Sequence, residues 1–253
     1  MENHTREFEG KAILVTGGAS GIGAEAARLL GARGARVMIA DIDGAAAEAT
    51  AARLRASGAE TFSTRLDVTD AAAVNAAIPE TAEVLGGLDG SLNNAGVVTP
   101  FHRVAELPAE EWQRQIAVNL SGVFNCMQAE LRVMLAQGGG SIVNTSSILG
   151  LVSVAGRAGY AAAKHGVIGL TRTAALDYAE SNIRVNAIAP GYAETPILAG
   201  RSAEELAEIA GRHPVRRLAT ATEIAEAALF LLSDRAGFVT GTVLGVDGGY
   251  TAR

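Results

Sequence analysis

Residues 11–23 read KAILVTGGASGIG, an apolar run that ends in a glycine-rich turn where a helical pattern begins. Glycines let such a turn bend tightly and approach a ligand, and the helix that follows offers free N–H groups to a pyrophosphate. The spacing G-x-x-x-G-x-G differs from G-x-G-x-x-G, and the absence of a following Gly-Lys-Ser/Thr excludes a P-loop. The stretch predicts a dinucleotide-binding turn, with an ordinary tight turn as the alternative. The residues expected against the cofactor are Gly17, Ser20, Gly21, Ile22 and Gly23.

Short apolar runs alternate with helical patterns along the rest of the chain. Strands are expected at residues 11–16, 35–40, 60–66, 88–92, 141–145, 183–189 and 242–246, and helices at 21–33, 45–56, 71–85, 108–137, 159–180 and 222–233. Uninterrupted apolar runs are typical of strands buried on both faces, and strand–helix alternation favours a parallel sheet. We expect an α/β fold, a Rossmann-type doubly wound parallel sheet of about seven strands with helices on both faces. Residues 1–253 then form a single dinucleotide-binding catalytic domain, and residues 191–214, without an evident strand or helix, form its substrate-binding loop.

The composition limits the classes of function. Hydrophobic residues make up 49% of the 253 positions, which excludes a disordered chain, and the single cysteine, Cys126, excludes an intramolecular disulfide. The net charge of −6 argues against a nucleic-acid partner. Residues 1–6 lack the apolar run of a signal peptide, and no run of about 18 apolar residues predicts a membrane span. With neither a signal peptide nor a membrane span predicted, we expect a cytoplasmic protein. The four histidines do not stand at metal-ligand spacing with acids or cysteines, so we expect no catalytic metal.

Acidic residues end two of the expected strands. Asp41 can accept hydrogen bonds from both ribose hydroxyls of an adenosine and would repel a 2′-phosphate, and the neutral Ser20 supplies no cation for that phosphate. Both features favour NAD over NADP. The alternative role for Asp41 is to cap the next helix, for which Asp43 is the better candidate; Asp67 can meet the adenine amino group or begin the following turn. The residues expected around the adenosine are Asp41, Ile42, Asp67 and Val68.

Tyr160 and Lys164 stand four residues apart, so they share one face of the expected helix. A free phenol has a pKa of about 10, and a nearby ammonium favours the phenolate. Lowering that pKa to near 7 takes about 4 kcal/mol, which a close lysine and an oxidised nicotinamide can supply together. The chain has 19 arginines but only two lysines, Lys11 and Lys164, so a lysine at this position is notable. The alternative is an ordinary pair on a helix surface.

Ser147 lies 13 residues before Tyr160, just past the fifth expected strand. Doubly wound sheets bind ligands at the carboxyl ends of their strands, so a hydroxyl there can hold a substrate oxygen. Turn or cap chemistry is the alternative for Ser147, and Ser146 is the competing candidate.

These motifs occur in the order seen in short-chain dehydrogenases/reductases, and the chain resembles that family from Lys11 to about Tyr250. The motifs are Thr16–Gly23, Asn93-Asn94-Ala95-Gly96, Asn119, Ser147, Tyr160-x-x-x-Lys164 and Pro190-Gly191. The resemblance implies that Tyr160 is the acid/base, that Lys164 binds the nicotinamide ribose, and that Ser147 orients the reacting oxygen. Asn119 would interrupt its helix and hold a water in a proton relay.

The resemblance also implies the rest of the cofactor site. Its expected members are Asn94, Ala95, Gly96, Tyr160, Lys164, Pro190, Gly191, Ala193 and Thr195. Family members often carry a branched residue where this chain has Ala193, which leaves the backbone role intact. Relatives pack into tetramers, so a homotetramer is expected. Small residues such as Ala174 and Ala175 would permit helices of two subunits to approach closely, and the alternative is an ordinary helix contact within one chain.

The sequence thus predicts an NAD-dependent oxidoreductase that interconverts a secondary alcohol and its ketone, with cyclic alcohols favoured. The substrate, a small-molecule alcohol or ketone, is expected to meet Ser147, Leu149, Tyr160 and Tyr192. The alternative enzyme is a 3-oxoacyl-carrier-protein reductase, but such relatives usually prefer NADPH and carry a basic residue near position 20 or 41. A non-catalytic dinucleotide-sensing protein is the alternative of another class, although it would not need the four candidate catalytic residues together.

Overall fold

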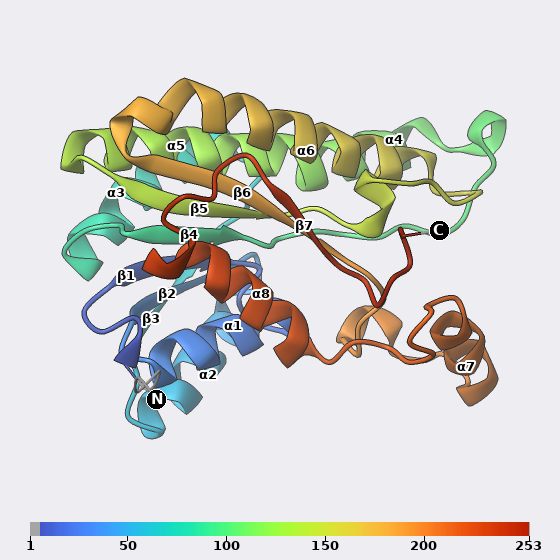
Figure 1. Ribbon diagram of the computed structural model, residues 1–253, viewed down its shortest axis with the longest axis horizontal. Coiled ribbons are helices and arrows are strands. Elements are labelled where there is room, and N and C mark those ends of the chain that lie inside the picture. Colours follow the sequence, from blue (N-terminus) through green and yellow to red (C-terminus); the bar gives the residue numbers. More distant parts are fainter. Residues whose placement is uncertain (1–5, 253) are drawn as a thin grey trace.

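The computed structural model describes residues 6–252, and within them a seven-stranded parallel sheet forms the centre of the molecule (Figure 1). The strands are β1 (Ala12–Thr16), β2 (Arg36–Asp41), β3 (Glu60–Arg65), β4 (Gly90–Asn93), β5 (Gly140–Thr145), β6 (Ile183–Pro190) and β7 (Val243–Val246). Their order, β3-β2-β1-β4-β5-β6-β7, reverses between β1 and β4, and a crevice at such a reversal is where doubly wound sheets bind ligands. The expected fold class is confirmed. Residues 1–5, on which the expectation of no signal peptide rests, lie outside the described residues.

Helices cover both faces of this sheet (Figure 1). The helices are α1 (Gly21–Ala32), α2 (Gly44–Ala56), α3 (Ala71–Leu85), α4 (Ala109–Ile116), α5 (Gly122–Gln137), α6 (Ala158–Tyr178), α7 (Ala203–Gly211) and α8 (Ala221–Leu232). Buried side chains of α1, α2 and α8 form one apolar cluster with the sheet, and those of α3, α5 and α6 form a second on the other face. Strand β1 shows why the apolar runs do not alternate, because Ile13 and Val15 join the first cluster while Ala12 and Leu14 join the second.

A π-helical turn, Ala117–Ser121, joins α4 to α5, which confirms the expected interruption near Asn119. Such turns insert an extra residue into a helix and often occur at functional sites. Asn119 is fully buried, and its amide bonds both backbone groups of Val97: Val97 N–H donates to Oδ1, and Nδ2 donates to the Val97 carbonyl, each at 2.9 Å. The interruption therefore fixes the chain segment that leaves β4.

The segment 191–214 is not the structureless loop that the sequence predicted. It contains a 3₁₀ turn, Pro196–Leu198, and the helix α7. Ser202 and Glu205 form a capping box at the start of α7, in which each side chain accepts from the other residue's backbone N–H. Backbone bonds join the two ends of this excursion, since Glu194 donates to the Ala219 carbonyl and Ala219 donates to the Tyr192 carbonyl. The expected loop is therefore an ordered helical excursion closed at its base.

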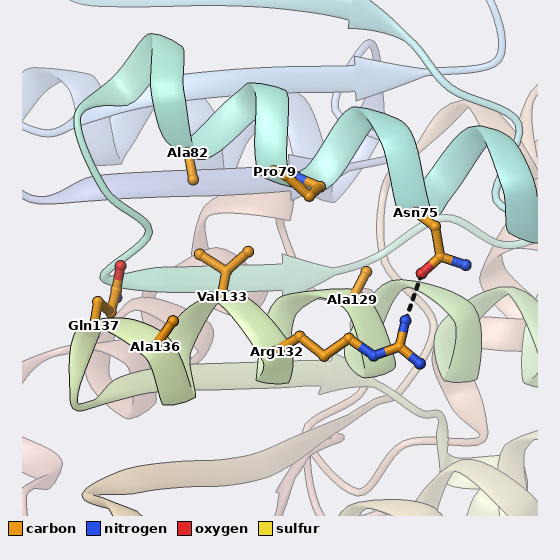
Figure 2. Close-up of a pocket in the computed structure, with 8 residues that line it drawn as sticks. All are labelled: Asn75, Pro79, Ala82, Ala129, Arg132, Val133, Ala136 and Gln137. Carbon is orange, nitrogen blue, oxygen red and sulfur yellow. Dashed lines mark hydrogen bonds between the residues drawn. The ribbon is translucent and has the colours of Figure 1, made fainter.

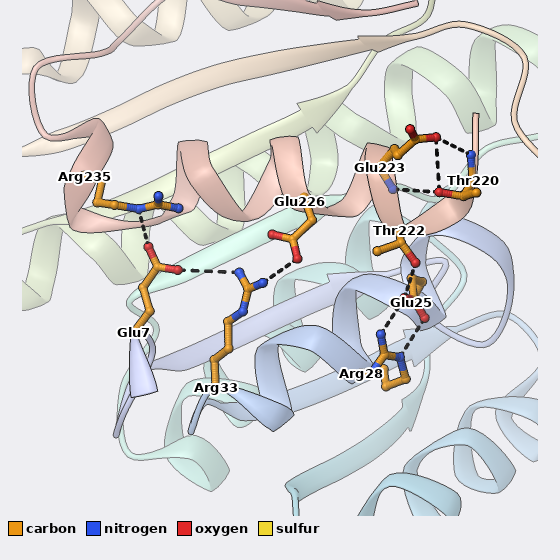
Figure 3. A network of polar contacts seen from close by, with 9 residues as sticks. All are labelled: Glu7, Glu25, Arg28, Arg33, Thr220, Thr222, Glu223, Glu226 and Arg235. Carbon is orange, nitrogen blue, oxygen red and sulfur yellow. Dashed lines mark hydrogen bonds and ion pairs between the residues drawn. The ribbon is translucent and has the colours of Figure 1, made fainter. Parts of the chain in front are cut away.

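Charged side chains tie the N-terminal segment to α1 and α8 (Figure 3). Arg33 lies between Glu7, at 3.5 Å, and Glu226 of α8, while Glu7 also accepts from Arg235 at 2.6 Å. The side chain of Glu7 is 11% exposed and that of Arg33 19% exposed. Because partial burial weakens screening, we expect this network to stabilise the fold more than isolated surface ion pairs do.

A second polar cluster is fully buried between the sheet and α5. Asn93 Nδ2 donates to Glu130 Oε2 at 2.9 Å and lies 3.0 Å from Asn144 Oδ1, and Asn144 in turn donates to the Thr171 hydroxyl at 3.0 Å. Glu130 is completely buried, and burial raises the pKa of its carboxyl to about 7 against the opposing effect of Asn93 and Ser91. Within residues 6–252 the atoms Glu130 Oε1, Asn93 Oδ1 and Ser91 Oγ are buried without a hydrogen-bond partner of good geometry, so burying a neutral carboxyl costs less here than burying a carboxylate.

Candidate functional site

The glycine-rich turn between β1 and α1 is held too closely to accept side chains. Gly17 has φ +61°, and a Cβ on it would lie 2.8 Å from the Cα of Ala95; a Cβ on Gly23 would lie 2.8 Å from Asn94 Nδ2. Asn94 also donates its side-chain amide to the Gly17 carbonyl, and its backbone N–H to Thr16 Oγ1, both at 3.1 Å. The turn and the end of β4 therefore form one rigid unit, with Gly17, Gly23, Asn94 and Ala95 together as predicted.

The start of α1 opens toward this unit. Ser20 is the N-cap residue, and among residues 6–252 its side chain makes no capping hydrogen bond, so the first N–H groups of α1 remain available to an acceptor. A Cβ placed on Gly21 would lie 3.5 Å from the Cβ of Thr195, which brings the segment after β6 against the turn. These residues fit a dinucleotide, because they form a narrow cradle with free backbone donors and no side chain in the way.

The two carboxylates expected near the adenosine take different positions. Asp41 accepts from Ala19 N–H with Oδ2 and from Asp43 N–H with Oδ1, both at 3.1 Å, so it lies directly against the glycine-rich turn. Asp43 is the N-cap of α2, as the alternative reading proposed. Asp67 accepts from the N–H and hydroxyl of Thr69, which lowers the pKa of its carboxyl, so it does begin the following turn. Ile42 is exposed beside Asp41, and Val68 is buried.

The four candidate catalytic residues converge on one place. Lys164 is buried on α6 and donates from Nζ to the Thr145 carbonyl at 2.7 Å, and its Nζ lies 5.7 Å from the ring centroid of Tyr160. A Cβ on Gly96 would lie 3.0 Å from Asn119 Oδ1 and 3.8 Å from Lys164 Nζ. The chain after β4, the π-helical turn and α6 thus meet beside the glycine-rich cradle.

The electrostatics of Tyr160 differ from the expectation. Burial raises the pKa of the phenol above its ordinary value, and the groups that lower it are the Ser147 hydroxyl and the Arg157 guanidinium, not Lys164. Burial also lowers the pKa of Lys164 to about 8. The Lys164 ammonium points to the Thr145 carbonyl rather than to the phenol, so the joint effect of Lys164 and an oxidised nicotinamide on Tyr160 stays a prediction.

The structure separates the two competing serines. Ser146 donates its hydroxyl to the Lys164 carbonyl at 2.9 Å and is fully enclosed, so it anchors α6. Ser147 faces Tyr160 closely enough to lower the pKa of the phenol, and its Oγ also accepts from Leu149 N–H at 3.1 Å. Ser147 is therefore the hydroxyl available to a reacting oxygen, and it also has the capping role given as its alternative.

An apolar cluster surrounds the ring of Tyr160. Its members are Ile148, Leu149, Ala161, Val154, Tyr160, Tyr192 and Tyr250. Sequence reasoning placed Leu149 and Tyr192 there but missed Tyr250, which reaches the cluster from beyond β7. It also missed His213, whose ring lies 5.8 Å from that of Tyr192 and 5.5 Å from that of Tyr250.

His213 connects α7 to the chain after β6. Its Nε2 accepts from Tyr192 N–H at 3.2 Å, so the proton resides on Nδ1, which donates to the Ile209 carbonyl at 3.2 Å. A Cβ on Gly191 would lie 2.8 Å from Nε2, so Pro190-Gly191 allows this close approach. No signal in the sequence distinguished His213 from the other histidines, because its partners lie on separate elements.

A groove of about 570 Å³ between α3 and α5 contains none of the predicted site residues (Figure 2). Its walls include Pro79 and Val133, and Arg132 donates to Asn75 Oδ1 across it at 2.9 Å. In the part of the chain that the structure describes, no cluster of three or more His, Cys, Asp or Glu could hold a metal ion. Over the same residues, none of the helices has the length and apolar character that a membrane crossing requires.

By its fold and site, the protein falls among the doubly wound enzymes that use a dinucleotide. A family model described as "Enoyl-(Acyl carrier protein) reductase" matches residues 17–251. The chain is 49% identical over 245 residues to cis-4-hydroxycyclohexanecarboxylate dehydrogenase of Sinomonas cyclohexanicum, covering 97% of this chain and 98% of that protein. It is 41% identical to cyclohexanol dehydrogenase of Acinetobacter sp. (strain SE19), covering 98% of each. The crystal structure of levodione reductase superposes with a TM-score of 0.93 at 39% identity, covering 97% of this chain and 99% of that one.

The chain belongs to the short-chain dehydrogenase/reductase family. It is an oxidoreductase that acts on CH–OH groups, interconverting a secondary alcohol and its ketone with a nicotinamide dinucleotide.

Proposed function

We propose that the protein is an NAD-dependent dehydrogenase of cyclic secondary alcohols. The observation that carries this proposal is the meeting of Ser147, Tyr160, Lys164 and Asn119 beside the glycine-lined cradle. The apolar cluster around Tyr160, with Leu149, Tyr192 and Tyr250, suits a hydrocarbon ring. Two similar proteins act, by their names, on cyclohexane alcohols, which supports the same substrate class.

Each residue of the site has a role that follows from its position. A bound oxidised nicotinamide supplies the hydride acceptor and a positive charge near the phenol. Tyr160 takes the proton of the substrate hydroxyl, and Ser147 donates to the same oxygen and stabilises its developing charge. Lys164 holds the ribose, and Asn119 holds a water through which the proton leaves; both side chains lie next to Gly96. The cofactor-binding residues are the set named from the sequence.

The cofactor choice rests on Asp41. Its carboxylate lies against the glycine-rich turn at the carboxyl end of β2, where it can accept from ribose hydroxyls and repel a 2′-phosphate. Arg65, the residue paired with Asp41 in β3, donates to the Ile42 carbonyl at 3.3 Å and is the cation closest in register. We expect wild-type kcat/KM to favour NAD over NADP by more than 100-fold.

The test of cofactor choice is Asp41→Ser, with Arg65 left in place to receive the phosphate. The ratio of kcat/KM with NAD to kcat/KM with NADP should fall at least 30-fold. The double variant that also carries Arg65→Gln should lose the increase in kcat/KM with NADP. Equal use of NAD and NADP by the wild type would refute the proposal for NAD.

The test of the chemistry is Tyr160→Phe, followed by NADH absorbance on a panel of cyclic and open-chain alcohols. We expect kcat to fall at least 10³-fold with the dinucleotide affinity retained within a few-fold. A variant that keeps most of its turnover would refute the role of Tyr160. Turnover of open-chain alcohols only would refute the cyclic substrate class. The acyl-carrier alternative is less favoured, because Ser20 and Asp41 offer no cation to a 2′-phosphate.

We further propose a cytoplasmic homotetramer of this single domain, with the excursion 191–214 covering the substrate. Large apolar side chains remain exposed on α4, α5 and α6 (Trp112, Phe124 and Leu176) and before β7 (Phe238). Exposed apolar side chains of this kind suit contacts between the subunits of a symmetric oligomer. Light scattering should give four times the 25.8 kDa chain mass, and Leu176→Glu should halve the assembly.

A further inference from the structure

One cation beside Tyr160 acts on the phenol through its charge but has no assigned contact with the substrate. Arg157 directly precedes α6, three residues before Tyr160, and is half-buried. Its guanidinium stacks on the Phe101 ring, 3.6 Å from the centroid, and donates to the Thr99 carbonyl. Among residues 6–252 its guanidinium has no ion pair with a carboxylate and no other side-chain hydrogen bond, so most of its five N–H donors are left for an outside acceptor.

The surroundings of Arg157 are those of the substrate pocket. Its electrostatic partners are the phenols of Tyr160 and Tyr192 and the guanidinium of Arg201. Burial is the main cause that lowers the pKa of Arg157, which shows a cation taken partly out of water without a counter-charge. Arg201 and Arg212 are each paired with a carboxylate of α7, Glu205 at 3.7 Å and Glu208 at 2.7 Å. Among residues 6–252, Arg157 is therefore the arginine beside Tyr160 and Tyr192 that has no carboxylate partner.

A purely structural role explains only half of this arrangement. Arg157 anchors the segment of Thr99 and Phe101, but one hydrogen bond and one ring face satisfy that role. A planar guanidinium binds a carboxylate through two parallel N–H donors, and it does so best where water is partly excluded. The position three residues from Tyr160 then fixes the distance between such a carboxylate and the reacting carbinol.

We propose that the site takes an anionic alicyclic alcohol, whose carboxylate pairs with Arg157 while its hydroxyl meets Tyr160 and Ser147. This inference rests on the proposed dehydrogenase function and adds the charge of the substrate to it. Tyr192 and Leu149 then cover the ring between the two polar ends.

The test compares cis-4-hydroxycyclohexanecarboxylate with cyclohexanol, which shares the ring but lacks the charge. We expect the ratio of their kcat/KM values to fall about 30-fold in Arg157→Gln, equivalent to about 2 kcal/mol, and to recover in part in Arg157→Lys. The matched control is Arg53→Gln, an exposed arginine of α2, whose ratio should equal that of the wild type. Equal losses for both substrates in Arg157→Gln would show a structural role and overturn the proposal.

A measurement on the wild type keeps the test independent of how well the variants fold. Cyclohexanecarboxylate should compete with cyclohexanol at least ten times more tightly than the neutral cyclohexanecarboxamide does, and salt should weaken only the carboxylate. If the carboxylate binds no more tightly than the carboxamide, the pairing of a substrate carboxylate with Arg157 is refuted, and the proposed dehydrogenase function is unaffected. If the wild type oxidises neither alcohol with either dinucleotide, the proposed function itself fails.

Discussion

Replacing the buried Glu130 with glutamine should flatten the dependence of stability on pH. Glu130 is completely buried, and burial raises the pKa of its carboxyl from 4.5 to about 7. Between these two values the folded state binds more protons than the unfolded state, so the free energy of unfolding falls as pH rises. The stability from this group is fully present below pH 4.5 and is lost as pH rises through 7. Raising the carboxyl pKa from 4.5 to about 7 corresponds to about 3 kcal/mol of unfolding free energy, of which about 2.5 kcal/mol is lost between pH 5 and pH 8.

The assay is urea unfolding of the wild type and Glu130→Gln at pH 5 and pH 8, at one protein concentration so that any association of chains contributes equally to both proteins. Glutamine keeps the shape and can still accept from Asn93 Nδ2. Other titrating groups are common to both proteins and cancel in the difference. We expect the wild type to lose about 2.5 kcal/mol more than the variant between the two pH values. Equal losses would refute the assignment of a buried carboxyl whose pKa is raised by burial.

Three further substitutions test the cradle, the π-helical turn and the N-terminal network. Gly17→Ala should weaken dinucleotide binding at least tenfold in calorimetry, because the φ of Gly17 is +61° and the new Cβ would meet the Ala95 backbone. An unchanged affinity would contradict the placement of the dinucleotide at this turn. Asn119→Ala should lower the free energy of unfolding by about 2–3 kcal/mol because both backbone groups of Val97 lose their partner, and a loss below about 0.5 kcal/mol would oppose this. Arg33→Met should cost about 1 kcal/mol at low salt and less at 1 M salt, whereas a salt-independent effect would assign the loss to packing.

The sequence predicted the features that arise from neighbouring residues. The seven expected strands all form, the glycines of residues 17–23 make the tight turn, and Asp43 caps α2. Each of these features depends mainly on residues that are close together in the sequence. The helix α7 was missed although Ser202 and Glu205 carry the spacing of a capping box. Its apolar face is short, so hydrophobic periodicity gave little signal there.

The electrostatics of the site could not be predicted because they depend on burial and direction. Spacing on one helix predicted that Lys164 and the nicotinamide together favour ionised Tyr160, but it gave no sign that the lysine donates to the Thr145 carbonyl. Nor did it indicate that Ser147 and Arg157, both from the irregular stretch between β5 and α6, lower the pKa of the phenol against the effect of burial. Tyr250 and His213 likewise join the site through contacts between elements far apart in sequence.

The closed base of the α7 excursion has a consequence for how new specificities arise. Two backbone hydrogen bonds clamp the chain where it leaves and re-enters the body of the protein, at Glu194 and Ala219. The stretch between these points meets the rest of the protein at Thr195, beside Gly21, and at His213, so residues between those two contacts can change while the strands and the proton-transfer residues keep their positions. On the proposal that this excursion covers the substrate, a graft of residues 196–212 from a relative should carry substrate preference with it.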